Sequence, residues 1–388
     1  MRFPEFTEEW KEERLSKIAE LSKGVGISKE QLSEDGEPCI LYGELYTKYK
    51  SEIIHKVISK TNIESSNLKR SKRNDVIIPC SGETAIDIAV ARCVTFDNIL
   101  LGGDLNIIRL HKDDGAFMAY QLNGKRKIDI AKLAQGVSVV HLYGENIKAI
   151  KTYNPCLQEQ QKIVKLLSML DERIEVQNKI IEDLKKLRSA ISKQVFAQGP
   201  NGWSRLDTLF SKGKAGGTPT STNKEYYNGE IPFLSINDIT KQGKYVRYTE
   251  NHLSQSGLEN SSAWVVPKYS LIMSMYASVG LVTINEIPIT TSQAMFAMQL
   301  KDKDLLDYLY YYLSYFKYRH IHKYLETGTQ SNINADIVRG IMIPTYGHSR
   351  NMEIASTLQS IDVKIDNELS VLKLFNRQKN YLLSQMFI

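Results

Sequence analysis

The sequence lacks several features that would each assign a chain to a particular class of protein. Its 388 residues contain no apolar run of about 18 residues, so no transmembrane helix is expected. Residues 1–10 are acidic and mixed and lack the apolar core of a secretion signal. Cysteine is scarce, and Cys39, Cys80, Cys93 and Cys156 form no Cys-x-x-Cys pair, which predicts free thiols and not disulfides or a zinc site. We therefore expect a cytoplasmic protein that does not associate with membranes.

A strong excess of charge of one sign is also missing. The chain has 50 basic and 44 acidic residues, a net charge of +6, and this mild balance excludes a histone-like basic arm. If the protein binds nucleic acid, it does so through a local patch. With 42% hydrophobic and 24% charged residues the composition is that of a globular protein, and the length suits two or three domains.

Motifs for catalysis are missing as well. We find no Walker A lysine loop, no nucleophile elbow and no glycine-rich loop after a strand that would hold S-adenosylmethionine. Asn154-Pro155-Cys156-Leu157 has neither the second proline nor the aromatic residue of an adenine methyltransferase motif, and Asn-Pro is typical of a helix cap and first turn. His320 and His322 have no third ligand nearby, so no metal site is expected. The sequence predicts a chain that is not an enzyme and binds no cofactor itself.

What the sequence does contain is an internal repeat. The segment from Ile163 to Phe196 aligns without gaps with the segment from Ile354 to Phe387, at an offset of 191 residues and with six identical positions. The chain is therefore interpreted as a globule and a long helix that occur twice. The predicted boundaries are a first globular domain at residues 1–152, a central long helix at 153–198, a second globular domain at 199–346 and a C-terminal long helix at 347–388.

Both long helices carry apolar residues at alternating steps of four and three, the pattern of a left-handed coiled coil. An antiparallel pairing within the chain would bury both stripes and would place Asp171 near Lys379 and Arg188 near Asp362. Pairing of the same stripes between two chains is the alternative. The predicted coiled-coil residues are Ile163, Leu167, Leu170, Ile174, Ile181, Leu184, Ile354, Leu358, Ile361, Ile365, Leu372 and Phe375.

Each globule is expected to mix helix and strand. Short β-branched runs at residues 75–79, 106–110 and 269–273 predict strands, and the apolar spacing over 304–318 predicts a helix. The predicted fold class is α+β, with two globular mixed α/β domains separated by two long helices that form an antiparallel coiled coil.

Several polar segments are candidates for contact with DNA. Residues 69–73 form a compact basic cluster, residues 241–248 interleave cations with tyrosines, and residues 326–333 form a polar loop whose Gln and Asn side chains can read adenine edges. Solvated loops and turns explain these segments equally well. The candidate residues are Lys69, Arg70, Lys72, Arg73, Ser81, Thr84, Thr218, Asn237, Lys241, Lys244, Tyr245, Arg247, Tyr276, Thr329, Gln330, Ser331 and Asn332.

Motifs along the whole chain carry a family resemblance. In the second globule, residues 216–219 and 226–239 are similar to the opening of a target recognition domain, and residues 328–344 are similar to its closing loop and strand. In the first globule, residues 24–29, 42–47, 81–84 and 102–104 resemble another subclass of that domain. The chain thus resembles the specificity subunit of a type I restriction-modification system. The start of the central helix also matches, through Pro155, Glu159-Gln160 and Ile163, whereas Arg350-Asn351 replaces Glu-Gln in the second copy.

The resemblance implies a role in a larger complex. Each recognition domain would read one half of an asymmetric bipartite site in double-stranded DNA, with the helix pair as the ruler for the unread spacer. The implied partners are two modification subunits, which methylate adenine with S-adenosylmethionine, and restriction or translocase subunits, which use ATP and Mg²⁺. The alternatives are the specificity chain of a related two-subunit restriction-methylation system, an autonomous DNA methyltransferase, and a coiled-coil scaffold or adaptor without DNA contact.

Overall fold

The computed structural model describes residues 2–64, 66–325 and 332–387. The chain divides into two compact units. Unit 1 comprises Met1–Lys179 and Leu369–Ile388, and unit 2 comprises Ile180–Glu368. Each unit therefore contains one globular domain together with a segment of each of the two long helices.

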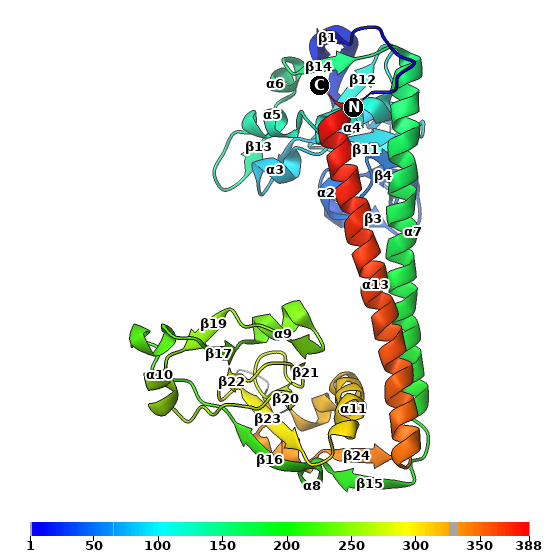
Figure 1. The fold of residues 1–388 in the computed structure, drawn as a ribbon. Coiled ribbons are helices and arrows are strands. Elements are labelled where there is room, and N and C mark those ends of the chain that lie inside the picture. The colour runs from blue at the N-terminus through cyan, green and yellow to red at the C-terminus, as the bar shows by residue number, and fades with distance from the viewer. Residues whose placement is uncertain (1, 65, 326–331, 388) are drawn as a thin grey trace. The chain divides into compact units, whose positions relative to one another are not determined.

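The long helices are α7 (Leu157–Phe196) and α13 (His348–Met386), drawn in green and in orange to red in Figure 1. The cap predicted at the start of the first helix is wrong. Asn154 is the last residue of strand β14 (Lys151–Asn154), where pairing with strand β1 keeps its backbone extended. The backbone N–H of Gln160 donates to the carbonyl oxygen of Cys156 at 3.1 Å, so the helix begins just after Cys156.

In both units the two helices run antiparallel. In unit 1, Ile163 near the start of α7 shares a hydrophobic core with Phe387 at the end of α13, and Asp171 pairs with Lys379. In unit 2, Phe196 shares a core with Ile354, and Arg188 pairs with Asp362. Both predicted charge pairs are present, and none of the twelve predicted coiled-coil residues is exposed. The predicted fold class is confirmed.

Unit 1 is built on two five-stranded sheets and two small two-stranded ones. In spatial order the first sheet is β2 (Ala19–Lys23), β12 (Leu105–Leu110), β8 (Asp75–Pro79), β10 (Arg92–Val94) and β5 (Ile53–Ile54). The second is β3 (Leu32–Ser33), β6 (Ser59–Thr61), β4 (Glu37–Ile40), β11 (Leu100–Leu101) and β7 (Lys69–Arg70). The small sheets pair β1 (Lys11–Arg14) with β14, and β13 (Val140–His141) with β9 (Ser81–Gly82).

Short helices connect these strands. They are α1 (Leu15–Ile18), α2 (Glu44–Thr47), α3 (Ala85–Ile88), α4 (Gly115–Asn123), α5 (Lys127–Lys132) and α6 (Gly144–Lys148), with a 3-10 turn at Lys29–Gln31. Helix α4 begins where the Asp114 side chain accepts a hydrogen bond from the backbone N–H of Phe117 at 3.0 Å. This helix matters most for the site below, because it packs the globule onto the long helices.

Unit 2 has one five-stranded and one three-stranded sheet. The first, in spatial order, is β16 (Phe210–Ala215), β23 (Met295–Leu300), β20 (Leu271–Ser274), β21 (Val282–Asn285) and β18 (Tyr245–Val246). The second is β19 (Asn251–Leu253), β17 (Ile231–Leu234) and β22 (Thr290–Thr291), and β15 (Gly202–Arg205) pairs with β24 (Met342–Thr345). The helices are α8 (Leu206–Leu209), α9 (Ile236–Gln242), α10 (Gln255–Glu259), α11 (Leu306–Arg319) and α12 (Ala335–Gly340), with 3-10 turns at Lys224–Tyr227, Lys303–Leu305 and Ile321–Tyr324.

The offset of 191 residues extends well beyond the long helices. Strand β1 corresponds to β15, α1 to α8, α4 to α11, α6 to α12 and β14 to β24, each pair starting 191 residues apart. These elements form the frame that attaches each globule to the long helices. The segment that follows β2 in unit 1 and the segment that follows β16 in unit 2 do not share the same order of strands and helices. The chain is thus a duplicated frame that carries two different inserts.

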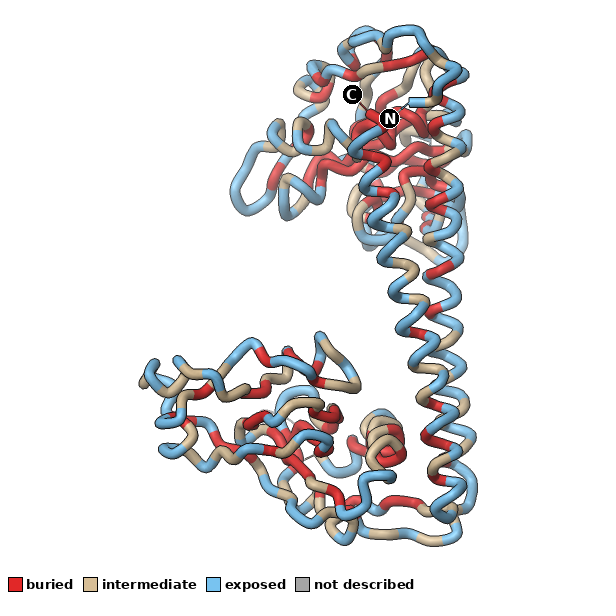
Figure 2. Tube along the Cα trace, in the orientation of Figure 1, coloured by how far each residue is buried: buried red, intermediate tan, exposed pale blue. Residues whose placement is uncertain are grey.

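The buried residues of each globule continue into the long helices, as Figure 2 shows in red. The main core of unit 1 includes Phe117 of α4, Leu167 of α7 and Leu382 of α13. The main core of unit 2 includes Leu309 of α11 and Leu358 of α13. No helix in the described part of the chain is both long and apolar enough to cross a membrane.

The four cysteines differ in access, and this makes a simple test of the fold. Cys39, Cys80 and Cys93 are buried and Cys156 is exposed. Burial raises the pKa of the Cys39 and Cys80 thiols to about 11 and that of Cys93 to about 12. At pH 8 we expect Ellman's reagent to titrate one thiol rapidly and the other three only after unfolding; rapid reaction of two or more would contradict the fold.

The same shifts predict a loss of stability in alkali. Because the buried thiols hold their protons to a higher pH than unfolded cysteines, their stabilising contribution is fully present below pH 9, the ordinary thiol pKa, and is lost as the pH rises toward 12. Denaturant titrations of the protein across this range will show the decline.

Candidate nucleic-acid interface

The basic cluster of the first globule lies at the edge of its second sheet. Arg70, in the edge strand β7, pairs with Glu37 at 2.7 Å and donates to the carbonyl oxygen of Asn98 at 3.1 Å. Lys72 and Arg73 follow in an exposed turn, where their backbone N–H groups are held by nearby carboxylates. Lys69 is half-buried. Only part of this cluster therefore presents cations to solvent.

Two further candidates of unit 1 have structural contacts of their own. Ser81 is buried in β9 and its hydroxyl donates to Asp104 at 3.2 Å. Thr84 is exposed and caps helix α3, accepting a hydrogen bond from the backbone N–H of Asp87 at 3.2 Å. Contact with DNA stays a prediction for both residues.

In unit 2, three exposed candidates pair with other side chains. Asn237 donates to Glu250 at 3.1 Å, and Lys241 forms an ion pair with the same carboxylate. Thr218 hydrogen-bonds Gln293. These are exposed polar contacts, worth little in stability, so another partner can displace them.

The run of cations and tyrosines over residues 244–247 contains strand β18, which is an edge strand of the five-stranded sheet. Lys244 is nearly buried and pairs with Asp307 at 2.6 Å. The Tyr245 hydroxyl donates to Asp307 at 3.0 Å, and burial raises its pKa. Arg247 is exposed and pairs with Glu286 at 2.7 Å. Of the three candidates on this run, only Arg247 is open to solvent.

The remaining candidates lie near the closing loop of the domain. Tyr276 is exposed in the turn between β20 and β21, and Asn332 is half-buried. Thr329, Gln330 and Ser331 lie outside the described residues.

Sequence reasoning missed a hairpin of unit 1 at the sequence position that corresponds, by the repeat offset, to this closing loop. Residues 135–141 precede residues 326–332 by 191, and in Figure 1 they form the loop that leads into β13. Two backbone hydrogen bonds between Gln135 and His141, at 2.9 and 2.7 Å, close the hairpin. At its tip Val137 is 98% and Val139 52% exposed, and His141 stacks on Tyr143. The repeat offset, extended from the helices into the globules, would have found it.

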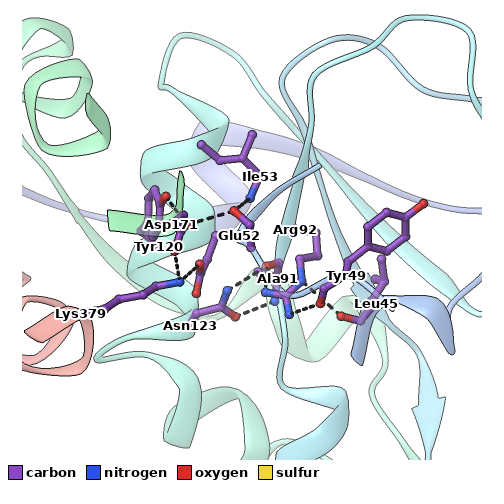
Figure 3. Close-up of polar contacts among 11 residues, drawn as sticks. Leu45, Tyr49, Glu52, Ile53, Ala91, Arg92, Tyr120, Asn123, Asp171 and Lys379 are labelled. Atoms are coloured by element: carbon purple, nitrogen blue, oxygen red, sulfur yellow. Dashed lines mark hydrogen bonds and ion pairs between the residues drawn. The ribbon is translucent and has the colours of Figure 1, made fainter. Parts of the chain in front are cut away.

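A buried ionic network fixes the first globule to the long helices (Figure 3). Lys379 of α13 pairs with Asp171 of α7 at 2.5 Å and with Glu52 of the globule, and all three side chains are at most 10% exposed. The hydroxyl of Tyr120, on α4, donates to Asp171 at 2.7 Å. Burial and these carboxylates raise the pKa of Tyr120, so the tyrosine stays a donor at neutral pH.

Arg92 lies on the globule side of this network (Figure 3). Its side chain is buried and donates to the carbonyl oxygens of Leu45 at 3.2 Å and Tyr49 at 3.1 Å. Burial lowers the pKa of Arg92, while the negative charges of Glu52 and Asp171 oppose that shift. Lys379 is thus the cation that pairs directly with the two carboxylates, and Arg92 adds a second buried positive charge that they stabilise.

Unit 2 repeats the central part of this network. Arg188 of α7 pairs with Asp362 of α13 at 2.5 Å, and the Tyr311 hydroxyl donates to Asp362 at 2.8 Å. Tyr120 and Tyr311 are 191 residues apart, as are Asp171 and Asp362. Each globule is therefore joined to the helix pair by a tyrosine, an aspartate and a cation in corresponding positions.

The comparisons with known proteins agree with this duplicated design. A family model described as the type I restriction modification DNA specificity domain matches twice, at residues 7–186 and 200–372. No group of three or more histidine, cysteine or acidic side chains that could hold a metal ion is found among the described residues.

Curated relatives carry the same description. The MjaIX specificity subunit of a type I restriction enzyme from Methanocaldococcus jannaschii is 27% identical over 158 residues, which span 39% of this chain and 36% of that protein. The putative MjaX specificity subunit of the same organism is 25% identical over 293 residues, or 69% of this chain and 66% of that protein. The alignments thus span about one third to two thirds of these relatives.

A solved structure shows the same fold over nearly the whole chain. The S subunit of a type I restriction-modification system from M. genitalium superposes with a TM-score of 0.63 at 17% identity, covering 98% of this chain and 96% of that one. This likeness shows the fold, and the two matches of the family model show the relationship. The chain belongs to the family of the type I restriction-modification DNA specificity domain and carries two copies of that domain.

Proposed function

We propose that this chain is the DNA-recognition subunit of a type I restriction-modification complex in the cytoplasm, and that it is not itself catalytic. The observation that carries the proposal is the duplicated frame with two different inserts, on a chain that carries two specificity domains. Each unit reads one half of a bipartite site in double-stranded DNA. Because the inserts differ, the two half-sites differ and the site is asymmetric.

The duplicated frame suits two copies of the same partner protein, one bound to each unit. Corresponding helices and strands start 191 residues apart in the two units, so each unit offers an equivalent surface to one copy of the same protein. We assign these surfaces to two modification subunits, which carry S-adenosylmethionine. ATP and Mg²⁺ belong to restriction or translocase subunits.

The hairpin at residues 135–141 joins the DNA-contact candidates. Its backbone is closed at the base, its tip is apolar and exposed, and it corresponds to the polar loop proposed to read bases in the second domain. A hairpin of this kind fits the major groove, where apolar side chains contact thymine methyl groups.

A genome-wide map of N6-methyladenine tests the proposal directly. The map is made in the source cell with and without this chain, while the modification subunit is expressed. We expect loss of one asymmetric motif made of two short half-sites and an unread gap. A map that does not change would contradict the proposal and favour a scaffold without DNA contact.

The helix pair as a spacer ruler gives a second test. Deleting residues 176–182 and 367–373 together removes one heptad from each helix and about 10 Å at 1.5 Å per residue. We expect the unread gap to shorten by about 3 base pairs, at 3.4 Å each, with both half-sites unchanged. Deletion of either heptad alone is the control, because it breaks the pairing register. An altered half-site with an unchanged gap would disprove the ruler.

A further inference from the structure

Unit 2 has a cavity beside its long helices that none of the DNA-contact candidates lines. Its volume is about 360 Å³, and it lies between α7, α11 and the turn that joins β20 to β21. Gly280 lets this turn come close to α11: its φ is +77°, and an added Cβ would lie 3.3 Å from Cγ of Lys317. The walls belong to elements of unit 2 alone.

The charge of the cavity has one sign. Arg188, Lys317 and Arg319 line it, and among the described residues of its wall there is no aspartate or glutamate. Serine and tyrosine hydroxyls also line the cavity, from Ser189, Ser192, Ser314 and Tyr310, whereas the Tyr311 hydroxyl already donates to Asp362. The cavity therefore offers donors and positive charge to a ligand, although Asp362 behind the wall pairs with Arg188 and so offsets one of the three charges.

The three cations that line the cavity differ in their ion pairing and burial. Arg188 is oriented by its ion pair with Asp362 at 2.5 Å, and a guanidinium has further N–H donors to offer. Lys317 is half-buried, and neither it nor Arg319 forms an ion pair with any described residue. Burial without a counter-charge lowers the pKa of Lys317, so an anion in the cavity would stabilise its charged form.

The first unit keeps only part of this cavity wall: Lys317 corresponds to Arg126 and Arg188 to Lys379, but the other positions differ. At the offset of 191, Arg319 corresponds to Ile128, and Tyr315 corresponds to Gly124. An added Cβ on Gly124 would lie 3.1 Å from the carbonyl oxygen of Leu383, so in unit 1 the corresponding space is closed by the backbone of α13. The cavity is a feature of the second unit and not of the shared frame.

We infer that this cavity binds a phosphate group of the DNA backbone and so positions the second recognition domain on the duplex. The inference rests on the proposed function and adds a site to it. Phosphate oxygens accept hydrogen bonds from guanidinium, ammonium and hydroxyl groups, which are the groups that line the cavity. A phosphate contact fixes register and orientation but reads no bases.

The test is the salt dependence of DNA binding by the chain in complex with its modification subunit. The variant Lys317→Gln/Arg319→Gln keeps both side chains polar and removes two charges. Because each phosphate contact contributes about 0.9 to the slope of log K against log salt concentration, we expect the slope to fall by about 1. The methylated motif stays the same.

A matched control separates a site from a general loss of charge. Lys301→Gln/Lys303→Gln removes two exposed charges from the same unit, away from the cavity wall. We expect this variant to keep the slope of the unmodified protein. An equal fall in both variants would overturn the site.

The other outcomes are also decisive. If the complex binds DNA and the cavity variant keeps the full slope, the inference is wrong while the proposed function stands. Sodium phosphate at matched ionic strength could raise the melting temperature of the unmodified protein but not that of the Lys317→Gln/Arg319→Gln variant. If the salt dependence of DNA binding is then the same for both proteins, the cavity holds free phosphate and not the DNA backbone. If the unmodified complex does not bind DNA, the proposed function fails and this inference with it.

Discussion

Replacing Lys379 with methionine should destabilise unit 1 by about 3–5 kcal/mol, the usual cost of removing one partner from a buried ion pair. Lys379 faces two carboxylates, those of Asp171 and Glu52, and each of these side chains is only 7% exposed. Methionine fills a similar volume but leaves both carboxylates buried without this cation. Because Tyr120 also hydrogen-bonds Asp171, the loss loosens the contact between the globule and the helix pair.

The corresponding change in unit 2, Arg188→Met, should cost less, roughly 1–3 kcal/mol. Arg188 neutralises one carboxylate, and the side chains of Arg188 and Asp362 are 40% and 17% exposed. Water can therefore hydrate Asp362 once the cation is gone. Lys186→Met is a matched surface control on α7, where an exposed pair with Glu182 is worth less than about 1 kcal/mol.

The unfolding of unit 1 can be followed by itself. Trp10 packs edge-on against Phe117 and Phe387 in unit 1, whereas Trp203 and Trp264 belong to unit 2. In a background with Trp203→Phe and Trp264→Phe, fluorescence in a denaturant titration reports unit 1 alone. We expect the midpoint to fall strongly with Lys379→Met and little with Lys148→Met, which removes an exposed ion pair with Glu145 from the same unit.

The pH dependence of the stability loss in Lys379→Met distinguishes the effect of the unpaired carboxylates from the effect of altered packing. Burial raises the pKa of an unpaired carboxylate, so its destabilising effect is present above that pKa and fades as the pH falls and the group takes up a proton. The difference between Lys379→Met and the unmodified protein should therefore shrink as the pH falls from 8 to about 5. A difference that does not change with pH would show that packing, not charge, explains the loss.

The pairing of the long helices could be predicted from the sequence because the heptad spacing and the charged positions occur in both copies of the repeat. The heptad spacing marks the stripe, and the positions of Asp171, Lys379, Arg188 and Asp362 choose the antiparallel register. The start of α7 could not be predicted in the same way. Asn154-Pro155 is typical of a cap, but the pairing of β14 with β1, which is distant in sequence, holds Asn154 in a strand.

The inserts were less predictable for a physical reason. Several of their strands are two or three residues long, too short for alternation to distinguish them from loops. The DNA-contact candidates were chosen by side-chain type, and a sequence does not show which cations find a carboxylate across the fold. Lys244 is an example, because its partner Asp307 lies on α11.

Substitutions at the tip of the hairpin at residues 135–141 should have a large effect on DNA methylation. We expect the variant Val137→Ala/Ser138→Ala/Val139→Ala to lower methylation of the full motif by about 10- to 100-fold, because each lost base contact costs about 1–3 kcal/mol. The remaining methylation should show relaxed sequence preference in one half-site only. The other half-site and the gap stay as they are, because the inserts of unit 2 and the helices are untouched.

The control for this variant is Ile58→Ala, which removes an apolar side chain that is 50% exposed in the same unit but outside the hairpin. It should leave both the level of methylation and the methylated motif unchanged.

The alternative role for the exposed valines is that they bind a partner protein instead of DNA. If the hairpin variant no longer co-purifies with the modification subunit, or if activity falls with no change in either half-site, the hairpin does not read DNA. Since the hairpin is closed by backbone hydrogen bonds between Gln135 and His141, the three substitutions alter its surface and not its path. A change confined to one half-site therefore reports the contact itself.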